Sequence, residues 1–234
     1  MKLSIIIPVY NEEKTVGKII EKVKVVKLPQ RVSREIIVVD DGSTDLTGKI
    51  LKTIKGIELL KHQENKGKGA AVRTGLARAS GDVLLIQDAD LEYDPKDYVK
   101  LLEPIVTKKT QVVYGSRLMD YPLRLWGKDK TPLPFHYIGN KFLSFITRLL
   151  YGGRVTDMET CYKVFTKDIA KKLHLRSNSF DLEPEITAKI LKQGYRIFEV
   201  PIKVKPRDYK EGKKITWRDG FFALWNLLRY RIVD

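Results

Sequence analysis

The sequence predicts an α/β fold in which helices flank a mostly parallel sheet. Short runs of Ile, Val and Leu alternate with segments of helical periodicity through the first half of the chain, as they do in repeated strand–helix units. Polar clusters follow three of these runs, at residues 10–12, 40–45 and 88–92. Because ligands bind beyond the carboxyl ends of the strands in such sheets, the clusters predict a binding site at that edge.

The first half of the chain is the more regular part. Continuous aliphatic runs predict strands buried on both faces at residues 2–9, 35–39, 57–60 and 83–86. Apolar residues at helical spacing predict a helix at about 11–27, with Val16, Ile19, Ile20 and Val23 on its buried face. We expect Ser43 or Thr44 to cap the next helix. Residues 67–69 are expected to begin a third helix, which runs to residue 79.

The second half is less regular. A helix at about 96–107 and a strand at 111–114 lead into residues 118–134, a basic segment whose length is typical of a functional lid. Helices are predicted at about 136–150, 181–193 and 217–232, and extended segments near 164–165 and 197–204. Since no linker divides the chain, we expect one domain, residues 1–234.

Composition limits the class of protein. The chain of 234 residues is 43% hydrophobic and 31% charged, which indicates a globular protein. Cys161 is its one cysteine, which excludes an internal disulfide and fits a reducing compartment. With no signal peptide and no long apolar stretch, we expect a cytoplasmic protein without a membrane span. The net charge of +15 predicts a polyanionic partner: a phosphorylated substrate, an anionic membrane surface or nucleic acid.

Three carboxylates, those of Asp88, Asp90 and Glu92, lie where the fourth predicted strand ends. Side chains alternate along an extended segment, so Asp88 and Asp90 point the same way and repel each other unless a cation lies between them. A hard divalent cation shared with substrate phosphates, Mg²⁺ or Mn²⁺, meets that need. The alternative is a solvated acidic loop. Because these acids would repel nucleic-acid phosphates, we expect no nucleic-acid partner, and a basic nucleic-acid-binding domain is only a remote alternative.

Four motifs occur in order along the chain, at residues 6–12 (IIPVYNE), 39–45 (VDDGSTD), 65–69 (NKGKG) and 88–90 (DAD). Together they resemble the inverting family 2 glycosyltransferases, which have the Rossmann-like GT-A fold. Residues 115–117 (GSR) and 157–163 (DMETCYK) resemble the subgroup that makes dolichyl-phosphate mannose or dolichyl-phosphate glucose. The resemblance implies a nucleotide-sugar-binding half, residues 1–117, and an acceptor-binding half, residues 118–234.

The resemblance also implies a reaction: transfer of a hexose from GDP-mannose or UDP-glucose to a polyprenyl or dolichyl phosphate, with a divalent metal as Lewis acid. The nucleotide contacts that it implies come from successive strand ends: Pro8, Tyr10, Glu12, Asp40, Lys68, Asp88 and Ala89. The metal ligands are Asp90 and Glu92, with Asp88 either a ligand or a ribose contact. The catalytic residues are Asp90, Arg117, Asp157 and Glu159. Turn formation is the alternative interpretation of Asp40 and, more strongly, of Asp41.

The acceptor decides whether a general base is needed. A lipid phosphate needs none, because it is already an anion at neutral pH, but it needs cations to hold it. The candidate cations are Arg117, Arg124, Lys128, Lys130, Lys205 and Arg207. A sugar hydroxyl would instead require a base, for which Asp157 and Glu159 are the candidates. The subgroup often has small residues where this chain has Glu159, Thr160 and Cys161, so the choice between these acceptors stays open.

Two amphipathic aromatic helices, at about 135–150 and 217–230, are flanked by Arg and Lys and suit an anionic membrane surface. We expect the first to face lipid, because it follows the basic segment, and the second to pack its Trp and Phe inside the core. We interpret His62, His136 and His174 as structural or exposed. The predicted protein is therefore peripheral to the cytoplasmic face of the cell membrane.

Overall fold

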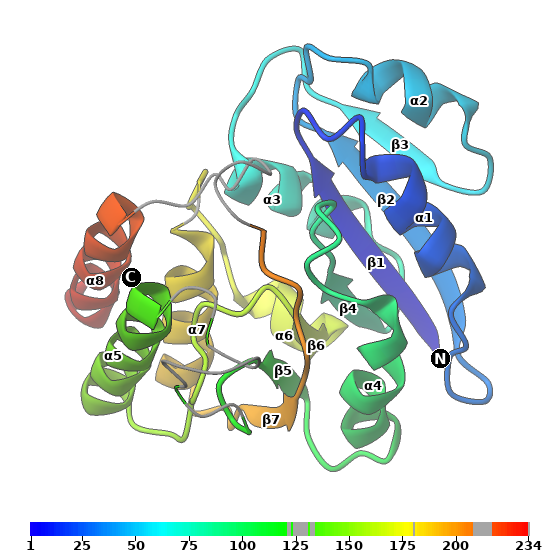
Figure 1. The fold of residues 1–234 in the computed structure, drawn as a ribbon. Coiled ribbons are helices and arrows are strands. Elements are labelled where there is room, and N and C mark those ends of the chain that lie inside the picture. The colour runs from blue at the N-terminus through cyan, green and yellow to red at the C-terminus, as the bar shows by residue number, and fades with distance from the viewer. Residues whose placement is uncertain (121–122, 124–130, 132–133, 180, 208–216, 234) are drawn as a thin grey trace.

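The computed structural model describes residues 1–120, 123, 131, 134–179, 181–207 and 217–233 (Figure 1). The strands are β1 Lys2–Val9, β2 Ser33–Asp40, β3 Glu58–Lys61, β4 Val83–Ile86, β5 Val112–Ser116, β6 Lys163–Thr166 and β7 Phe198–Pro201. The α-helices are α1 Val16–Val25, α2 Thr47–Thr53, α3 Lys68–Arg78, α4 Tyr98–Val106, α5 Pro134–Tyr151, α6 Lys167–Lys172, α7 Leu182–Lys192 and α8 Trp217–Ile232.

In the described part of the chain the strands form one sheet in the order β3-β2-β1-β4-β6-β5-β7. β1 pairs in parallel with β2 and with β4, β2 pairs in parallel with β3, and β5 pairs in parallel with β7. β6 is antiparallel to both of its neighbours, β4 and β5. The predicted α/β fold with a mostly parallel sheet is confirmed.

Helices flank the sheet along its length. α3 packs against β1 and β2, and α4 packs against β5 and β6. α1 and α2 lie at one end of the molecule, whereas α5, α7 and α8 gather at the other (Figure 1). The aliphatic side chains of β1 and β4 are almost wholly buried, as expected of strands covered on both faces.

The first helix begins later than predicted, at Val16 instead of residue 11. Asn11 adopts a left-handed conformation with a φ of 51°, which Asn tolerates better than most residues. Its N–H donates to Ser43 Oγ at 3.0 Å, and its Oδ1 accepts from the Thr44 N–H at 2.8 Å. These bonds tie Asn11 to residues 43 and 44 in a loop and use the Ser43 hydroxyl, one of the two groups expected to cap α2. Asp45 binds the start of α2 instead, because its Oδ1 accepts from the Thr47 N–H at 2.9 Å.

The six-residue helix α6 was not predicted, because a helix this short contains too few residues to show a period. The part of segment 118–134 that would contain Arg124, Lys128 and Lys130 lies outside the described residues. The lid interpretation of that segment therefore stays a prediction.

α5 and α8 pack against each other, and both expose apolar side chains. On α5 the exposed residues follow a spacing of three and four: Phe135, Ile138, Phe142, Phe145 and Leu149. On α8 they include Phe222, Trp225, Leu228 and Ile232, whereas the small or polar Ala223 and Asn226 are buried with Leu227. The prediction that α8 turns its Trp and Phe side chains inward was wrong, because Trp225 and Phe222 are exposed. Within the described residues, every helix is too short or too polar to traverse a bilayer.

The contact between α3 and β1 gives a test of the packing. A Cβ added at Gly75 would lie 2.5 Å from Cγ2 of Ile6, which is fully buried. We expect Gly75→Ala to lower the free energy of unfolding by about 1–3 kcal/mol, as overpacked cores do, measured by urea denaturation. Gly139→Ala is the matched control, because a Cβ at that helical position meets no atom within 4 Å. The control should be neutral or stabilising, and equal stabilities for the two variants would contradict the close contact.

Candidate active site

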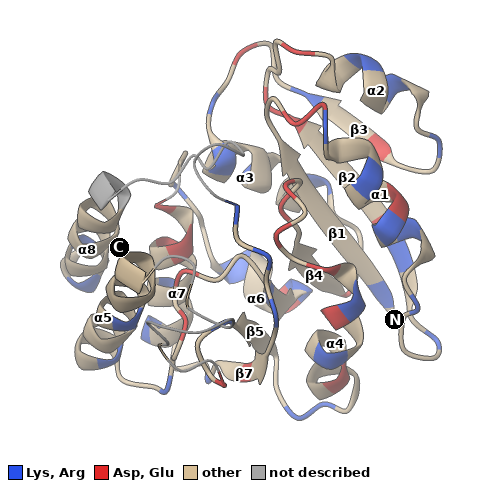
Figure 2. Ribbon diagram, in the orientation of Figure 1, with Lys and Arg blue, Asp and Glu red and all other residues tan. Residues whose placement is uncertain are grey.

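A cleft of about 410 Å³ opens at the carboxyl ends of β1, β2 and β4. Acidic segments follow β1 and β4 at this edge (Figure 2). The structure brings together eleven of the predicted site residues as its lining: Pro8, Tyr10, Glu12, Lys68, Asp88, Ala89, Asp90, Glu92, Arg117, Glu159 and Arg207. Strand ends far apart in the sequence therefore converge where the sequence predicted.

A buried amide fixes the start of the acidic segment. Gln87 is wholly buried after β4, and its Oε1 accepts from the hydroxyls of Tyr98 and Tyr162, each at 2.8 Å. Its Nε2 donates to the carbonyl oxygen of Asp88 at 2.9 Å. A buried polar group without a hydrogen-bond partner would destabilise the fold, so these bonds are kept. They hold the backbone at Asp88 in one position.

Lys68, the first residue of α3, is the counter-ion of Asp88. Its Nζ lies 2.9 Å from Asp88 Oδ1 and 2.8 Å from Glu183 Oε1 of α7. Burial favours the neutral amine, but the two carboxylates outweigh it and raise the pKa of Lys68 well above its usual value. Although burial alone would raise the pKa of Asp88, Lys68 lowers it. Asp88 is thus already neutralised by a lysine, which leaves Asp90 and Glu92 as the better candidates for a metal.

Asp90 and Glu92 carry charge that the protein compensates less fully. Burial, together with the neighbouring Asp88 and Glu92, raises the pKa of Asp90 to about 7. Its Oδ1 accepts from the Glu92 N–H at 3.0 Å. Among the described residues, no three His, Cys, Asp or Glu side chains are arranged to hold a metal by themselves. Two carboxylates suit Mg²⁺ or Mn²⁺, which commonly take their remaining ligands from water and substrate phosphates.

Arg207 closes one side of this acidic region. Its guanidinium pairs with the Glu12 carboxylate at 3.0 and 3.2 Å, and its Nε donates to the Asp90 carbonyl at 2.8 Å. Its backbone N–H donates to Glu92 Oε1 at 2.9 Å. Arg207 therefore lies beside the predicted metal ligands. The neighbouring Lys205 side chain is exposed and does not line the cleft.

The two aspartates at the end of β2, Asp40 and Asp41, have different positions from those expected. Asp40 is 1% exposed, does not line the cleft, and accepts from the Ser43 N–H at 2.9 Å, so it forms the turn. Asp41 lines the cleft and lies 2.6 Å from Nδ1 of His62. It also accepts from the backbone N–H groups of residues 66 and 67. The assignment of the base contact to Asp40 is not supported, because neighbouring residues of a turn point in different directions.

Arg117 and Asp157 form a bidentate ion pair, with both N···O distances 2.7 Å. The Arg117 backbone N–H also donates to Asp157 Oδ2 at 2.9 Å. Asp157 is fully buried and does not line the cleft. Its backbone N–H donates to Glu199 Oε1 of β7 at 3.1 Å. Asp157 therefore positions Arg117 and is not placed to act as a base on a substrate in the cleft.

Glu159 differs from every other acid around the cleft. It lines the cleft, and its Oε1 is buried without a hydrogen-bond partner among the described residues. Burial and then Glu183 raise its pKa to about 7, against the opposing effects of Lys163 and Arg117. A carboxyl group with this pKa exchanges protons readily at neutral pH.

Several lining residues were not predicted: Asn65, Tyr93, His136, Asn140, Cys161, Ser179 and Glu183. Asn65 lies within the motif at residues 65–69 and could have been included. His136 was interpreted as structural or exposed, but it lines the cleft from α5. Glu183 had no usable signal, because an acid in the first turn of a helix is common for electrostatic reasons alone.

Comparison with known proteins gives a family. The sequence profile of Glycosyl transferase family 2 matches residues 4–173. A UDP-N-acetylglucosamine–dolichyl-phosphate N-acetylglucosaminyltransferase of Methanococcus voltae is 32% identical over 250 residues, covering 97% of this chain and 95% of the relative. A dolichyl-phosphate beta-glucosyltransferase of Dictyostelium discoideum is 30% identical over 204 residues, covering 77% of this chain and 60% of the relative.

Solved structures agree in fold. Glucosyl-3-phosphoglycerate synthase from Mycobacterium tuberculosis, in complex with Mn²⁺, UDP and glucosyl-3-phosphoglycerate, superposes with a TM-score of 0.72 at 19% identity. The match covers 100% of this chain and 81% of that chain. The same enzyme with Mg²⁺ and UDP gives a TM-score of 0.73 at 20% identity, covering 100% and 80%. The fold is therefore GT-A.

The ion pair between Arg117 and Asp157 gives a stability test. Asp157→Asn leaves a largely buried guanidinium without its counter-charge. We expect a loss of about 3 kcal/mol in the free energy of unfolding, the lower end for buried pairs, because part of the Arg117 side chain reaches solvent. Urea denaturation measures the loss. Asp120→Asn, at an exposed position, is the control, and equal stability of the two variants would contradict the structural role of the pair.

Proposed function

This chain belongs to glycosyl transferase family 2, and on that premise we propose that it transfers a hexose from a nucleotide sugar to a polyprenyl phosphate, with inversion at the anomeric carbon. The donor is UDP- or GDP-linked, and the cofactor is Mg²⁺ or Mn²⁺. The relatives named above support a dolichyl-phosphate type of acceptor, and one of them names a UDP donor. Residues 1–117 form the donor half and residues 118–234 the acceptor half.

The observation that carries the acceptor assignment is the position of α5. Its residues His136 and Asn140 line the cleft, while Phe135, Ile138 and Phe142 on the other side of the helix are exposed. A ligand with a phosphate head and an apolar tail matches this arrangement, because the head enters the cleft and the tail follows the exposed apolar residues. A soluble sugar acceptor has no apolar tail that would contact the exposed apolar residues of α5.

The residues then divide the work. The acceptor phosphate is an anion at neutral pH, so its oxygen attacks C1 of the sugar without a general base. The bond from C1 to the diphosphate breaks, and the nucleoside diphosphate leaves. Asp90 and Glu92 would hold a divalent cation, which would supply Lewis-acid stabilisation of that leaving group. Arg117, held by Asp157, and Arg207, held by Glu12, supply fixed positive charge near the two phosphate groups.

A membrane location follows from this acceptor. We place the protein at the cytoplasmic face of a membrane, peripherally bound, with its exposed apolar helix toward lipid. The net charge of +15 supports attraction to an anionic surface. We do not assign the positive charge to nucleic-acid binding, because the carboxylates around the cleft would repel the phosphates of a nucleic acid.

A second candidate function has one observation in its favour, the buried Glu159 Oε1 that has no hydrogen-bond partner in the described part of the chain. A carboxyl group with a pKa of about 7 is suited to remove a proton from a sugar hydroxyl. The acceptor would then be a hydroxyl group, and Glu159 would be the base. Asp157, the other candidate base, is occupied by Arg117.

The metal assignment predicts the effect of Asp90→Asn. With the charge of one ligand removed, transfer in the presence of Mn²⁺ should fall by about 10²-fold or more, as when a transition-state electrostatic contact is lost. The measurement is transfer from UDP- and GDP-hexoses to a polyprenyl phosphate, together with a thermal-shift titration of the nucleotides with Mn²⁺. Glu103→Gln on the exposed side of α4 is the control for charge and fold. If no nucleotide raises the melting temperature of the wild type, the donor site is wrong.

Glu159→Gln separates the two acceptors. For a phosphate acceptor, the turnover of the variant should stay within a few-fold of the wild-type value. Above pH 7 its KM for the acceptor should be lower than that of the wild type, because there the wild-type Glu159 is ionised and repels the phosphate. For a hydroxyl acceptor, the wild-type rate should rise as pH increases through about 7, because the base form appears there. The variant should then lose about 10²–10⁴-fold in rate. A large loss with the lipid phosphate would overturn the preferred function.

A further inference from the structure

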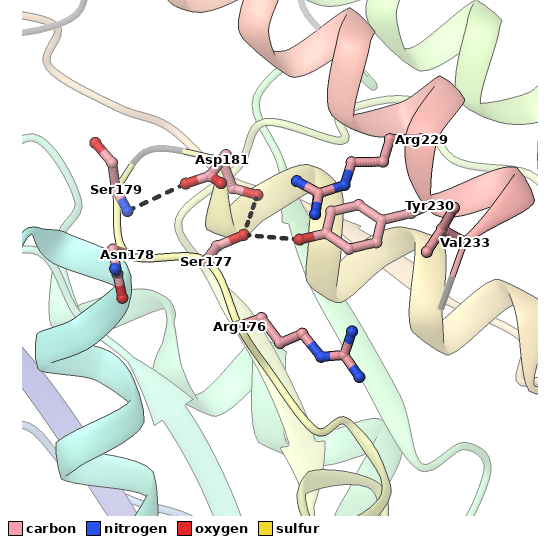
Figure 3. Close-up of a pocket in the computed structure, with 8 residues that line it drawn as sticks. All are labelled: Arg176, Ser177, Asn178, Ser179, Asp181, Arg229, Tyr230 and Val233. Atoms are coloured by element: carbon pink, nitrogen blue, oxygen red, sulfur yellow. Dashed lines mark hydrogen bonds between the residues drawn. The ribbon is translucent and has the colours of Figure 1, made fainter.

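A second pocket, of about 320 Å³, lies between residues 176–179, Asp181 and the last turns of α8 (Figure 3). It is separate from the active-site cleft, although Ser179 lines both cavities. The segment between them is fastened to α3, because Arg73 donates to the carbonyl oxygen of Ser177 at 3.1 Å and to Asn178 Oδ1 at 2.6 Å. The pocket therefore has a fixed wall that it shares with the cleft.

The charge in this pocket is positive and available. Arg176 and Arg229 line it with exposed side chains, and neither guanidinium has an ion-pair partner in the described part of the chain. Asp181 is the one acid among the described lining residues, and its Oδ1 already accepts from the Ser179 N–H at 3.1 Å. Figure 3 shows Asp181 next to Arg229 and away from Arg176. Two guanidiniums with free N–H groups suit phosphate oxygens.

Two nearly buried hydroxyls lie between the arginines. Tyr230 and Ser177 are 7% and 4% exposed, and their oxygens are 3.2 Å apart. Ser177 also donates to the carbonyl oxygen of Asp181 at 3.3 Å. Both distances are long for bonds between oxygen atoms, so these bonds are weak. The Tyr230 hydroxyl can turn to an incoming anion at little cost, which would add a neutral donor to the two cationic ones.

The pocket borders an apolar surface. We call apolar face the exposed apolar residues of the two helices, which are Phe135, Ile138, Phe142, Phe145 and Leu149 of α5 with Phe222, Trp225, Leu228 and Ile232 of α8. Arg229 follows Trp225 by four residues, so the two side chains lie on one side of α8. Val233, which is also exposed, lines the pocket itself. If the apolar face lay on the hydrocarbon layer of a membrane, the charged lipid headgroups would lie at the level of Arg229.

We propose that this pocket binds the phosphate of an anionic phospholipid headgroup while the apolar face lies on the bilayer. Arg176 and Arg229 pair with the phosphate oxygens, and Tyr230 donates a hydrogen bond to them. This site is distinct from the acceptor phosphate of the reaction. The inference rests on the proposed function only in placing the protein at a membrane, since the pocket has no part in the chemistry of transfer.

The test is co-sedimentation of the whole chain with vesicles of phosphatidylcholine alone or of equal parts phosphatidylcholine and phosphatidylglycerol. The pocket variant is Arg176→Gln with Arg229→Gln. The matched control is Arg148→Gln with Arg231→Gln, which removes the same charge from exposed positions of α5 and α8 outside the pocket. The pocket variant should lose at least about fivefold more affinity for the anionic vesicles than the control, because both lose long-range attraction and one also loses direct phosphate contacts. Tyr230→Phe should show a smaller loss in the same direction.

Three outcomes would overturn the proposal. The first is equal loss in the two double variants, which would mean that only overall charge matters. The second is equal binding of the wild type to both kinds of vesicle. The third is a concentration-dependent dimer that hides the apolar face and binds no vesicle. Saturating inorganic phosphate distinguishes the sources of the anion: a rise in melting temperature that the pocket variant loses, without any vesicle binding, would indicate a site for a free phosphate.

Transfer to a short-chain isoprenyl phosphate in detergent separates this inference from the proposed function. The pocket variant should retain wild-type turnover there and the wild-type melting temperature, because neither arginine contacts the cleft. If the wild type shows no transfer but the vesicle results are as expected, the proposed function fails and the headgroup site stands.

Discussion

The rest of the site depends on the two ion pairs that the ammonium group of Lys68 makes. A charge that is largely removed from water is costly unless it is paired, and here one lysine pairs with two carboxylates, the partly buried Asp88 after β4 and the buried Glu183 on α7. These acids come from segments far apart in the chain. Lys68 therefore joins two walls of the cleft, the segment after β4 and the first turn of α7.

Charge compensation also divides the acids of the cleft into two groups. Asp88, Asp157 and Glu12 each have a lysine or arginine partner within 3.0 Å and serve to hold that partner in place. Asp90 and Glu159 have no such partner of their own, and the pKa of each is raised to about 7. Within the described residues, the acids without a lysine, arginine or histidine partner therefore lie at two places in the cleft, after β4 (Asp90 and Glu92) and at Glu159.

The helix α5 connects that cavity to the outside of the protein. One side contributes His136 and Asn140 to the cleft, and the opposite side contributes to the apolar face. The amphipathic α5 therefore has one side in the polar cleft and the other side on the outer surface of the protein. The same helix packs on α8, whose last turns border the second pocket. The arrangement places the catalytic cleft and the pocket of Arg176 and Arg229 on two sides of one short segment.

The sequence by itself determined that the chain forms a mostly parallel sheet, most of its strands and helices along the chain, and the placing of site residues at the strand ends, because hydrophobic periodicity is a local property. The order of strands within the sheet and the short helix α6 came only from the structure. Only the tertiary structure decided which acids are neutralised. The partners are distant in the chain: Lys68 lies 20 residues from Asp88, Arg117 40 from Asp157, and Glu12 195 from Arg207. It also decided that Asp41 and not Asp40 lines the cleft, and that α8 exposes Trp225. Local patterns show that a helix is amphipathic, but only packing decides what its apolar side meets.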